Sequence, residues 1–211
     1  MNVPRGLIGA CAVAAALLFT FAASAYPGGN HFDHAARGHD FWRNALCDIA
    51  RTTAIGGAPN VVGAGFARVA MSTMAVAIGL LMYSLPRHFP ARPALGQVVR
   101  ALAAVSVPAS LTVVFLPTDR YSHLHGLVTM TAGLVGTGGA LLAVVAAVRD
   151  TRRPSIWLGV LTLAAAFGSL GVYLVELVAG GPPRLAVPVL EHVAAVLLLI
   201  WMLAFEAEKR V

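Results

Sequence analysis

Charged residues are scarce in this chain. Asp, Glu, Lys and Arg make up 11% of its 211 residues, whereas soluble domains contain about 25%. Apolar residues instead make up 58%, and the mean hydropathy is +0.79. A chain this apolar is not intrinsically disordered, because disorder requires low hydrophobicity and a high net charge. The composition therefore indicates a membrane protein.

Paired cysteines, a basic stripe and compact catalytic motifs are also lacking. Cys11 lies inside an apolar run and Cys47 in a polar segment, so a disulfide framework is not expected. The net charge is +6, but the 15 Lys and Arg residues are scattered, so we expect no nucleic-acid partner. The sequence contains no HExxH, GxGxxG or P-loop motif, which excludes zinc and nucleotide sites built on those motifs.

The sequence contains several long apolar runs. A membrane-spanning helix needs about 20 consecutive apolar residues, and no linker or internal repeat divides the chain. We therefore predict an all-α polytopic membrane bundle that forms one transmembrane domain over residues 1–211. The six expected spans are 7–25, 61–85, 94–116, 124–148, 155–179 and 185–205, and a longer loop, 26–60, joins the first two.

The first run also has the features of a cleaved secretory signal. Arg5 precedes it and Ala23-Ser24-Ala25 ends it, which is the usual order of a basic region, an apolar core and a small-residue cleavage site. The run is longer than a typical signal core, which favours a retained helix. Both interpretations stay open from the sequence.

Basic residues are distributed unequally between the two ends of the predicted spans. Cytoplasmic loops of membrane proteins carry an excess of Lys and Arg. We therefore expect both termini to lie in the cytoplasm. The cytoplasmic set is then Arg5, Arg87, Arg92, Arg149, Arg152, Arg153, Lys209 and Arg210, whereas the short outer loops hold only Arg120 and Arg184.

This topology places most of the ionisable residues at the outer face. All histidines except His88 lie there, and "PTDRYSHLHG" at 117–126 lies at the same face. Glu191 and His192 are about 9 Å into the last span, where unpaired charge is costly. Arg68 is a candidate ion-pair partner for Glu176 or Glu191. The alternative is that these are helix-end groups satisfied by water and headgroups.

The segment "DFWRNALCDIAR", residues 40–51, predicts an amphipathic helix in the first outer loop. Phe41, Ala45, Leu46 and Ile49 would form its apolar stripe, and Asp40, Asn44, Asp48 and Arg51 its polar stripe. Such a helix would either cover the bundle or act as a lid whose Asn44 and Asp48 face the histidines and glutamates.

Two short motifs resemble a known family. Trp42, Asn44, Asp48 and Ile49 match its loop motif, and Pro117, Asp119 and His125 match the stretch that opens its fourth span. The chain thus resembles the bacterial membrane family called domain of unknown function 998, which is similar to Frag/DRAM/Sfk-like proteins. Cys47 stands where the family has Ser. The resemblance implies a six-span fold and its topology, and it implies no established activity.

Three functions are compatible with an outer polar site. The first is a membrane-embedded enzyme or binding site that acts on or binds a lipid or lipid-linked ligand. As an enzyme it would be a metal-dependent hydrolase with His125, Glu191 and His192 as zinc ligands. Asp48, Asp119 and Glu176 would then serve the catalysis, and Asn44, Arg68 and His123 would complete the polar site. The second is a non-catalytic regulator or accessory subunit with a structural polar network. The third is a haem protein with His125 and His192 as axial ligands.

Overall fold

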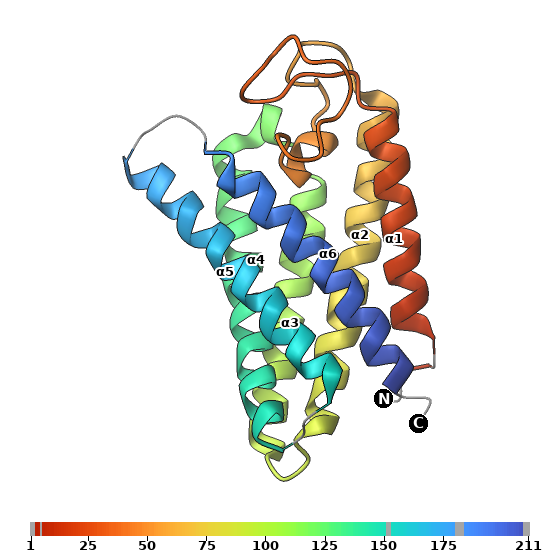
Figure 1. Ribbon diagram of the computed structural model, residues 1–211, viewed down its shortest axis with the longest axis vertical. Coiled ribbons are helices and arrows are strands. Elements are labelled where there is room, and N and C mark those ends of the chain that lie inside the picture. Colours follow the sequence, from red (N-terminus) through yellow and green to blue (C-terminus); the bar gives the residue numbers. More distant parts are fainter. Residues whose placement is uncertain (1–2, 5, 151–152, 180–183, 209–211) are drawn as a thin grey trace.

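The computed structural model describes residues 3–4, 6–150, 153–179 and 184–208. These residues form six long α-helices and two short 3₁₀ helices (Figure 1). Six of the helices are long and apolar enough to cross a membrane. The elements are α1 (Leu7–Ser24), η1 (Leu46–Ala50), α2 (Val61–Ser84), η2 (Leu85–His88), α3 (Pro93–Val114), α4 (Thr118–Asp150), α5 (Pro154–Ala179) and α6 (Ala186–Ala207).

The predicted all-α fold with six spanning helices is confirmed. Pro93 and Pro154 stand at the first position of α3 and α5, where a residue without an N–H loses no helical hydrogen bond. The fourth span differs most from its prediction, because α4 begins at Thr118 rather than at 124. Tyr121 has non-helical angles (φ −132°, ψ 41°), so a kink separates the first turn of α4 from its apolar part.

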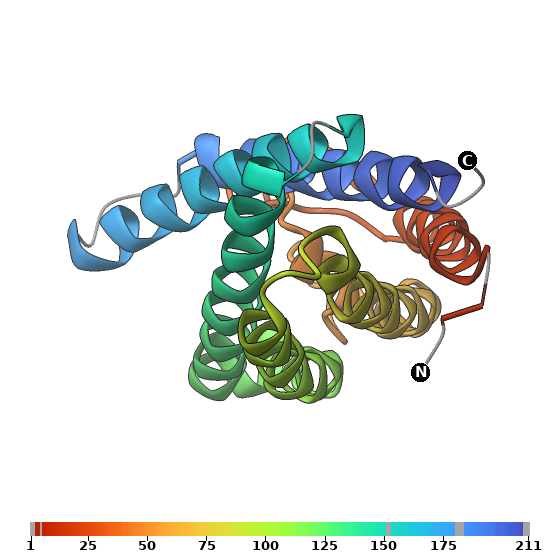
Figure 2. The same ribbon diagram turned by 90° about the horizontal axis from the view of Figure 1, so that it is seen from below.

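The helices pack as three neighbouring pairs: α1 with α2, α3 with α4, and α5 with α6. Viewed from below, α6 and α5 lie along one side, and α1 to α4 complete the bundle (Figure 2). α6 crosses the bundle obliquely and packs against α1 as well (Figure 1). The core near the start of α1 and the end of α6 includes the buried side chains of Leu81, Ile156, Trp201, Met202 and Phe205.

Small residues allow the close approach of the helices. A Cβ on Gly136 of α4 would lie 2.5 Å from Ser106 Oγ of α3, and one on Gly159 of α5 would lie 2.7 Å from the Trp201 ring of α6. Ala132 and Ala140, which share a face with Gly136, are also buried. These contacts agree with the general use of small residues where membrane helices meet.

The start of α1 and the end of α6 lie at the end of the bundle opposite the long loop (Figure 1). The Gly6 N–H donates to Glu206 Oε1 over 2.7 Å, which ties the start of α1 to the end of α6. Ile8, Ala12, Ala15 and Ala22 of α1 are buried, so the first span is a packed member of the bundle. Four basic residues used to predict the orientation, Arg5, Arg152, Lys209 and Arg210, lie outside the described residues.

The loop at 26–60 contains a shorter helix than the sequence predicts. Instead of an amphipathic helix over 40–51, the structure has a turn at 41–43 and the five-residue η1. Side-chain bonds replace the helical ladder: the Asp40 N–H donates to Asn44 Oδ1 (2.9 Å) and the Ala45 N–H to Asp48 Oδ2 (2.8 Å). Asn and Asp commonly draw the backbone out of a helix in this way.

Candidate functional site

A cavity of about 900 Å³ lies inside the bundle beneath the loop. All six long helices contribute to its wall, together with His39, Phe41 and η1 of the loop. On α6 the lining extends from Glu191 to Trp201 and on α4 from Thr129 to Ala140. At 1.5 Å per residue, the cavity is about 15 Å long. Its volume is in the range of pockets that hold one small ligand, roughly 300–1,000 Å³.

The loop end of this cavity holds its ionisable side chains, and the rest is mainly apolar with scattered Ser and Thr hydroxyls. His39, Cys47, Glu191 and His192 line the loop end. The opposite end is lined by Leu81, Met82, Ala140 and Trp201. The cavity therefore has one end suited to hydrogen bonding and a long apolar part suited to a hydrocarbon chain.

Two imidazoles present unused nitrogen atoms at the polar end. The His192 Nδ1–H donates to the Pro188 carbonyl over 2.8 Å, because a carbonyl oxygen can only accept. In the neutral ring this leaves His192 Nε2 as an acceptor. His192 Nε2 and His39 Nε2 are both buried without a hydrogen-bond partner, and the two rings are 6.3 Å apart. Phe41 packs 4.2 Å from the His192 ring.

Glu191 is held by the loop. One carboxylate oxygen, Oε2, accepts a hydrogen bond from the Leu46 N–H at 3.2 Å. This contact joins α6 to the start of η1 across 145 residues of sequence, so the loop closes over the polar end of the cavity. Glu191 is the only carboxylate among the described lining residues of this cavity, and that lining includes no Lys or Arg.

The surroundings keep the two loop groups at the cavity uncharged. Burial and the neighbouring His192 lower the pKa of His39 to about 4, so its ring is neutral at physiological pH. Burial also raises the pKa of the Cys47 thiol, helped by Glu191, so Cys47 is not a reactive thiolate. No pattern in the sequence predicts that His39 lies beside His192, because that contact depends on the path of the loop.

The predicted loop residues Asn44 and Asp48 are buried, as a lid with an inward polar stripe would require. Their hydrogen bonds, however, stay within the loop. Asn44 Nδ2 donates to the Gly29 carbonyl at 2.9 Å, and Asp48 Oδ1 lies 3.4 Å from His31 Nε2. Neither residue lines the cavity, so both hold the shape of the loop.

Asp119 fastens the loop to the start of α4. Its Oδ1 accepts from the Thr52 N–H at 3.1 Å, and its Oδ2 accepts from Thr52 Oγ1 at 2.5 Å and from the Thr53 N–H at 3.0 Å. Arg120 Nε donates to Thr52 Oγ1 as well, at 3.2 Å. The carboxylate is thus engaged by three donors from the loop.

The two histidines of 117–126 differ in environment. His123 is exposed, whereas His125 is buried and its Nδ1–H donates to the Leu116 carbonyl at 2.5 Å. That bond joins the end of α3 to α4 beyond the kink. His125 does not line the cavity that holds His192.

The expected ion pairs of Arg68 are not formed. Within the described ranges, neither Glu176 nor Glu191 is paired with it, and Arg68 Nε is buried without a hydrogen-bond partner. Glu176 instead accepts from the Arg184 N–H across the α5–α6 connection. The end of α5 diverges from the rest of the bundle (Figure 1), which keeps Glu176 away from the cavity lining.

The three proposed zinc ligands do not form a cluster. Across the described part of the chain, no group of three or more His, Cys, Asp or Glu residues could hold a metal ion. Glu191 and His192 line one cavity, but His125 is engaged elsewhere. A metal-dependent hydrolase and a haem protein remain predictions to which this arrangement adds no support.

The His31–Asp48 contact predicts a pH-dependent loop. Its bond to Asp48 raises the pKa of His31 above the usual 6.5, so protonated His31 stabilises the loop. This contribution is complete below about pH 6.5 and is lost as pH rises through the higher folded pKa. Because the His31 side chain is 46% exposed, we expect less than about 1 kcal/mol. Hydrogen exchange should show faster loop opening in His31→Gln at pH 6 and no difference at pH 9, whereas equal effects at both would contradict the assignment.

The fold and the cavity together define a multi-pass membrane protein with an amphipathic cavity below one loop-covered face. Comparisons with models of protein families, with curated proteins and with solved structures found no match to this chain. The functional argument therefore depends on the geometry of the cavity.

Proposed function

We propose that this protein binds a single-chain lipid, or one chain of a lipid-linked molecule, in the cavity beneath the loop. The observation that carries this proposal is the division of one cavity into a polar end and a long apolar part. A soluble ligand would gain little from the apolar part. An amphipathic lipid fits both ends at once.

The dimensions favour a chain from one leaflet. The cavity is about 15 Å long, which is half of the roughly 30 Å hydrocarbon thickness of a bilayer. Its polar end lies toward the loop, near the ends of the spans, and Trp201 lies at its other end. A lipid of the loop-side leaflet could therefore keep its head near the membrane surface while its chain occupies the cavity.

The polar end favours a head that donates hydrogen bonds. Glu191 presents carboxyl oxygens that accept hydrogen bonds, neutral His192 Nε2 is an acceptor without a partner, and His39 Nε2 is also buried without a partner. A hydroxyl or ammonium group would satisfy them, and buried polar atoms are costly when left unpaired. An anionic head would instead meet Glu191 with no Lys or Arg among the described lining residues to balance it.

Two further proposals concern the location of the protein and its family, and they depend on the distribution of charge and on the resemblance described above. We propose a bacterial plasma membrane location with both termini in the cytoplasm and the loop outside, because in the sequence the short connections opposite the loop are rich in Lys and Arg, whereas the short connections on the loop side hold only Arg120 and Arg184. Membership of the domain-of-unknown-function 998 family also remains a proposal. A non-catalytic binding protein or regulator fits the geometry better than a hydrolase, because Asp48, Asp119 and Glu176 are all engaged away from the cavity lining.

A binding experiment with matched ligands tests this function. Oleyl alcohol and oleyl phosphate share one chain and differ in the charge of the head, so the alcohol should raise the unfolding temperature in neutral detergent more than the phosphate. His192→Phe keeps the ring packing and removes Nε2, and we expect about tenfold weaker binding of the alcohol, the equivalent of one hydrogen bond. His123→Phe makes the same change on an exposed residue and should bind like the original chain.

Two results would count against the proposal. One is equal stabilisation by the alcohol and the phosphate, which would mean that the polar end does not select the head. The other is a purified protein that binds neither compound above the level of nonspecific partition into detergent.

A further inference from the structure

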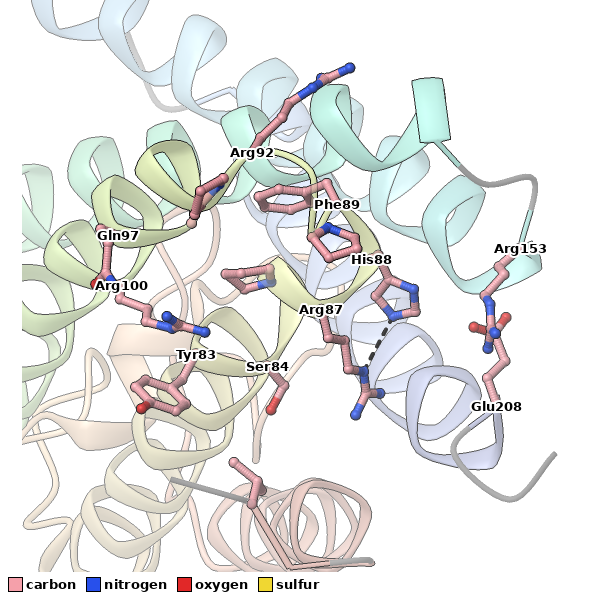
Figure 3. Close-up of a pocket in the computed structure, with 15 residues that line it drawn as sticks. Tyr83, Ser84, Arg87, His88, Phe89, Arg92, Gln97, Arg100, Arg153 and Glu208 are labelled. Carbon is pink, nitrogen blue, oxygen red and sulfur yellow. Dashed lines mark hydrogen bonds between the residues drawn. The ribbon is translucent and has the colours of Figure 1, made fainter.

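A second cavity lies at the opposite end of the bundle and is strongly basic. It also has a volume of about 900 Å³, and it lies between η2, the turn after it, the start of α3 and the ends of α5 and α6 that meet there (Figure 3). Four arginines line it and one carboxylate, Glu208. The arginines are Arg87, Arg92, Arg100 and Arg153.

The single carboxylate is already engaged. Glu208 Oε1 accepts from the Ser155 N–H at 2.9 Å, and Oε2 accepts from Ser155 Oγ at 2.6 Å. These bonds fasten the end of α6 to the start of α5. The lining therefore holds four arginines and this one carboxylate, and Glu206 nearby acts electrostatically on Arg87.

Arg100 is the clearest sign of a ligand. Its Nε is buried and has no hydrogen-bond partner, and its guanidinium carbon lies 4.9 Å from the centre of the Tyr83 ring. The ring holds the guanidinium in place by a cation–π contact and uses none of its donors. Figure 3 shows this group pointing from α3 toward the side of the cavity where Arg87 and His88 lie.

The position of the cavity indicates the source of the ligand. Arg100 lies about 10 Å along α3 from Pro93, inside the spanning segment, and Tyr83 lies near the end of α2. This is the depth at which aromatic residues meet lipid headgroups. Basic pockets between spanning helices bind anionic lipid headgroups, and arginine matches the geometry of phosphate oxygens.

We propose that this basic cavity binds the phosphate-bearing headgroup of an anionic membrane phospholipid. Arg100 and Arg87 contact the phosphate from α3 and η2, and Arg153 at the rim adds a further cation. The site is separate from the apolar cavity and lies at the other face of the membrane. Bound lipid would also fasten α3 to the α5–α6 pair.

The probe is dioleoyl phosphatidylglycerol added to the full chain in neutral detergent, with lipid retention measured by native mass spectrometry. Dioleoylglycerol has the same chains without phosphate, and inorganic phosphate has the anion without chains. We expect the phospholipid to bind at least tenfold more tightly than dioleoylglycerol and to bind less tightly at high salt. Inorganic phosphate should neither compete at millimolar concentration nor raise the unfolding temperature as the phospholipid does.

Three variants locate the site. Arg100→Gln and Arg153→Gln should each weaken retention of the phospholipid by about tenfold. Arg153 is exposed, so its change does not endanger folding and keeps the test valid if Arg100→Gln is unstable. Arg184→Gln makes the same charge change at the other face and should have no effect. If all variants retain the phospholipid equally, the lipid does not bind in this cavity. If inorganic phosphate alone stabilises the protein, the ligand of the cavity is not a lipid.

Discussion

Gly133→Leu is expected to weaken ligand binding in the apolar cavity severely and to leave the fold intact. Gly133 lines the cavity on α4, and a Cβ built there meets no other atom within 4 Å. A leucine side chain would therefore enter space that the ligand chain needs. Displacing three methylene groups costs about 2.4 kcal/mol at about 0.8 kcal/mol each, or roughly sixtyfold in affinity. This effect is larger than that expected for any one polar contact at the other end.

Trp201 provides the readout, because its ring is buried at the far end of the cavity. The other tryptophans are Trp42 and Trp157, and replacing both by Phe leaves Trp201 as the sole indole. A long-chain alcohol carrying bromine atoms in its chain should quench Trp201 fluorescence when it occupies the cavity. Gly133→Leu should remove most of that quenching.

Gly138→Leu is the matched control. It lies on the same helix, a Cβ there also meets nothing within 4 Å, and Gly138 does not line the cavity. Five residues along a helix correspond to a turn of about 140°, so the new side chain points elsewhere. If both variants are quenched as strongly as the original chain, the ligand does not occupy this cavity.

The spans could be predicted from the sequence because their cause is local. A helix such as α6 must satisfy its own backbone in a membrane and present about 20 apolar residues, and both properties are visible in the run 185–205. The ends of the spans were less predictable where polar residues continue a helix. Thr118 to Tyr121 form the first turn of α4 although the apolar run begins later, because their role is to meet the loop.

The loop could not be predicted, since long-range contacts determine its path. The spacing of Asn44 and Asp48 suits an amphipathic helix, but each side chain bonds the backbone near it and prevents that helix. Gly29 adopts φ 86°, and a Cβ there would lie 2.2 Å from the Gly56 N. Two irregular segments of the loop cross closely at this point, and such a crossing produces no periodic pattern in the sequence.

The candidate site was predictable in part. Glu191 and His192 could be identified from the sequence because ionisable side chains inside a membrane span are energetically costly and are usually functional. Both line the cavity. His39 and Cys47 did not stand out, because their position depends on how the loop returns over α6. His125 was equally conspicuous in the sequence, yet its bond to the Leu116 carbonyl gives it a role in joining α3 to α4.

Asp119→Ala is expected to release the loop from α4. The carboxylate accepts three hydrogen bonds from Thr52 and Thr53, and bonds to a charged acceptor contribute about 1.5–3 kcal/mol each when well protected. Asp119 is only half-buried, so we expect a total near 3 kcal/mol, or roughly hundredfold faster hydrogen exchange at the two backbone amides. The six spans should keep their helicity by circular dichroism, since no core residue changes.

The control for this variant is Asp33→Ala in the same loop. Asp33 Oδ1 accepts only the local bond from the Ala35 N–H, so exchange at Thr52 and Thr53 should stay unchanged. A catalytic Asp119 would behave in the opposite way, with unchanged exchange and lost activity toward a lipid substrate. Because the loop also supplies His39 and the Leu46 N–H to the cavity, release of the loop should weaken binding of oleyl alcohol in Asp119→Ala. Faster exchange at both threonines without weaker binding would show that closure of the loop is not needed to hold the ligand.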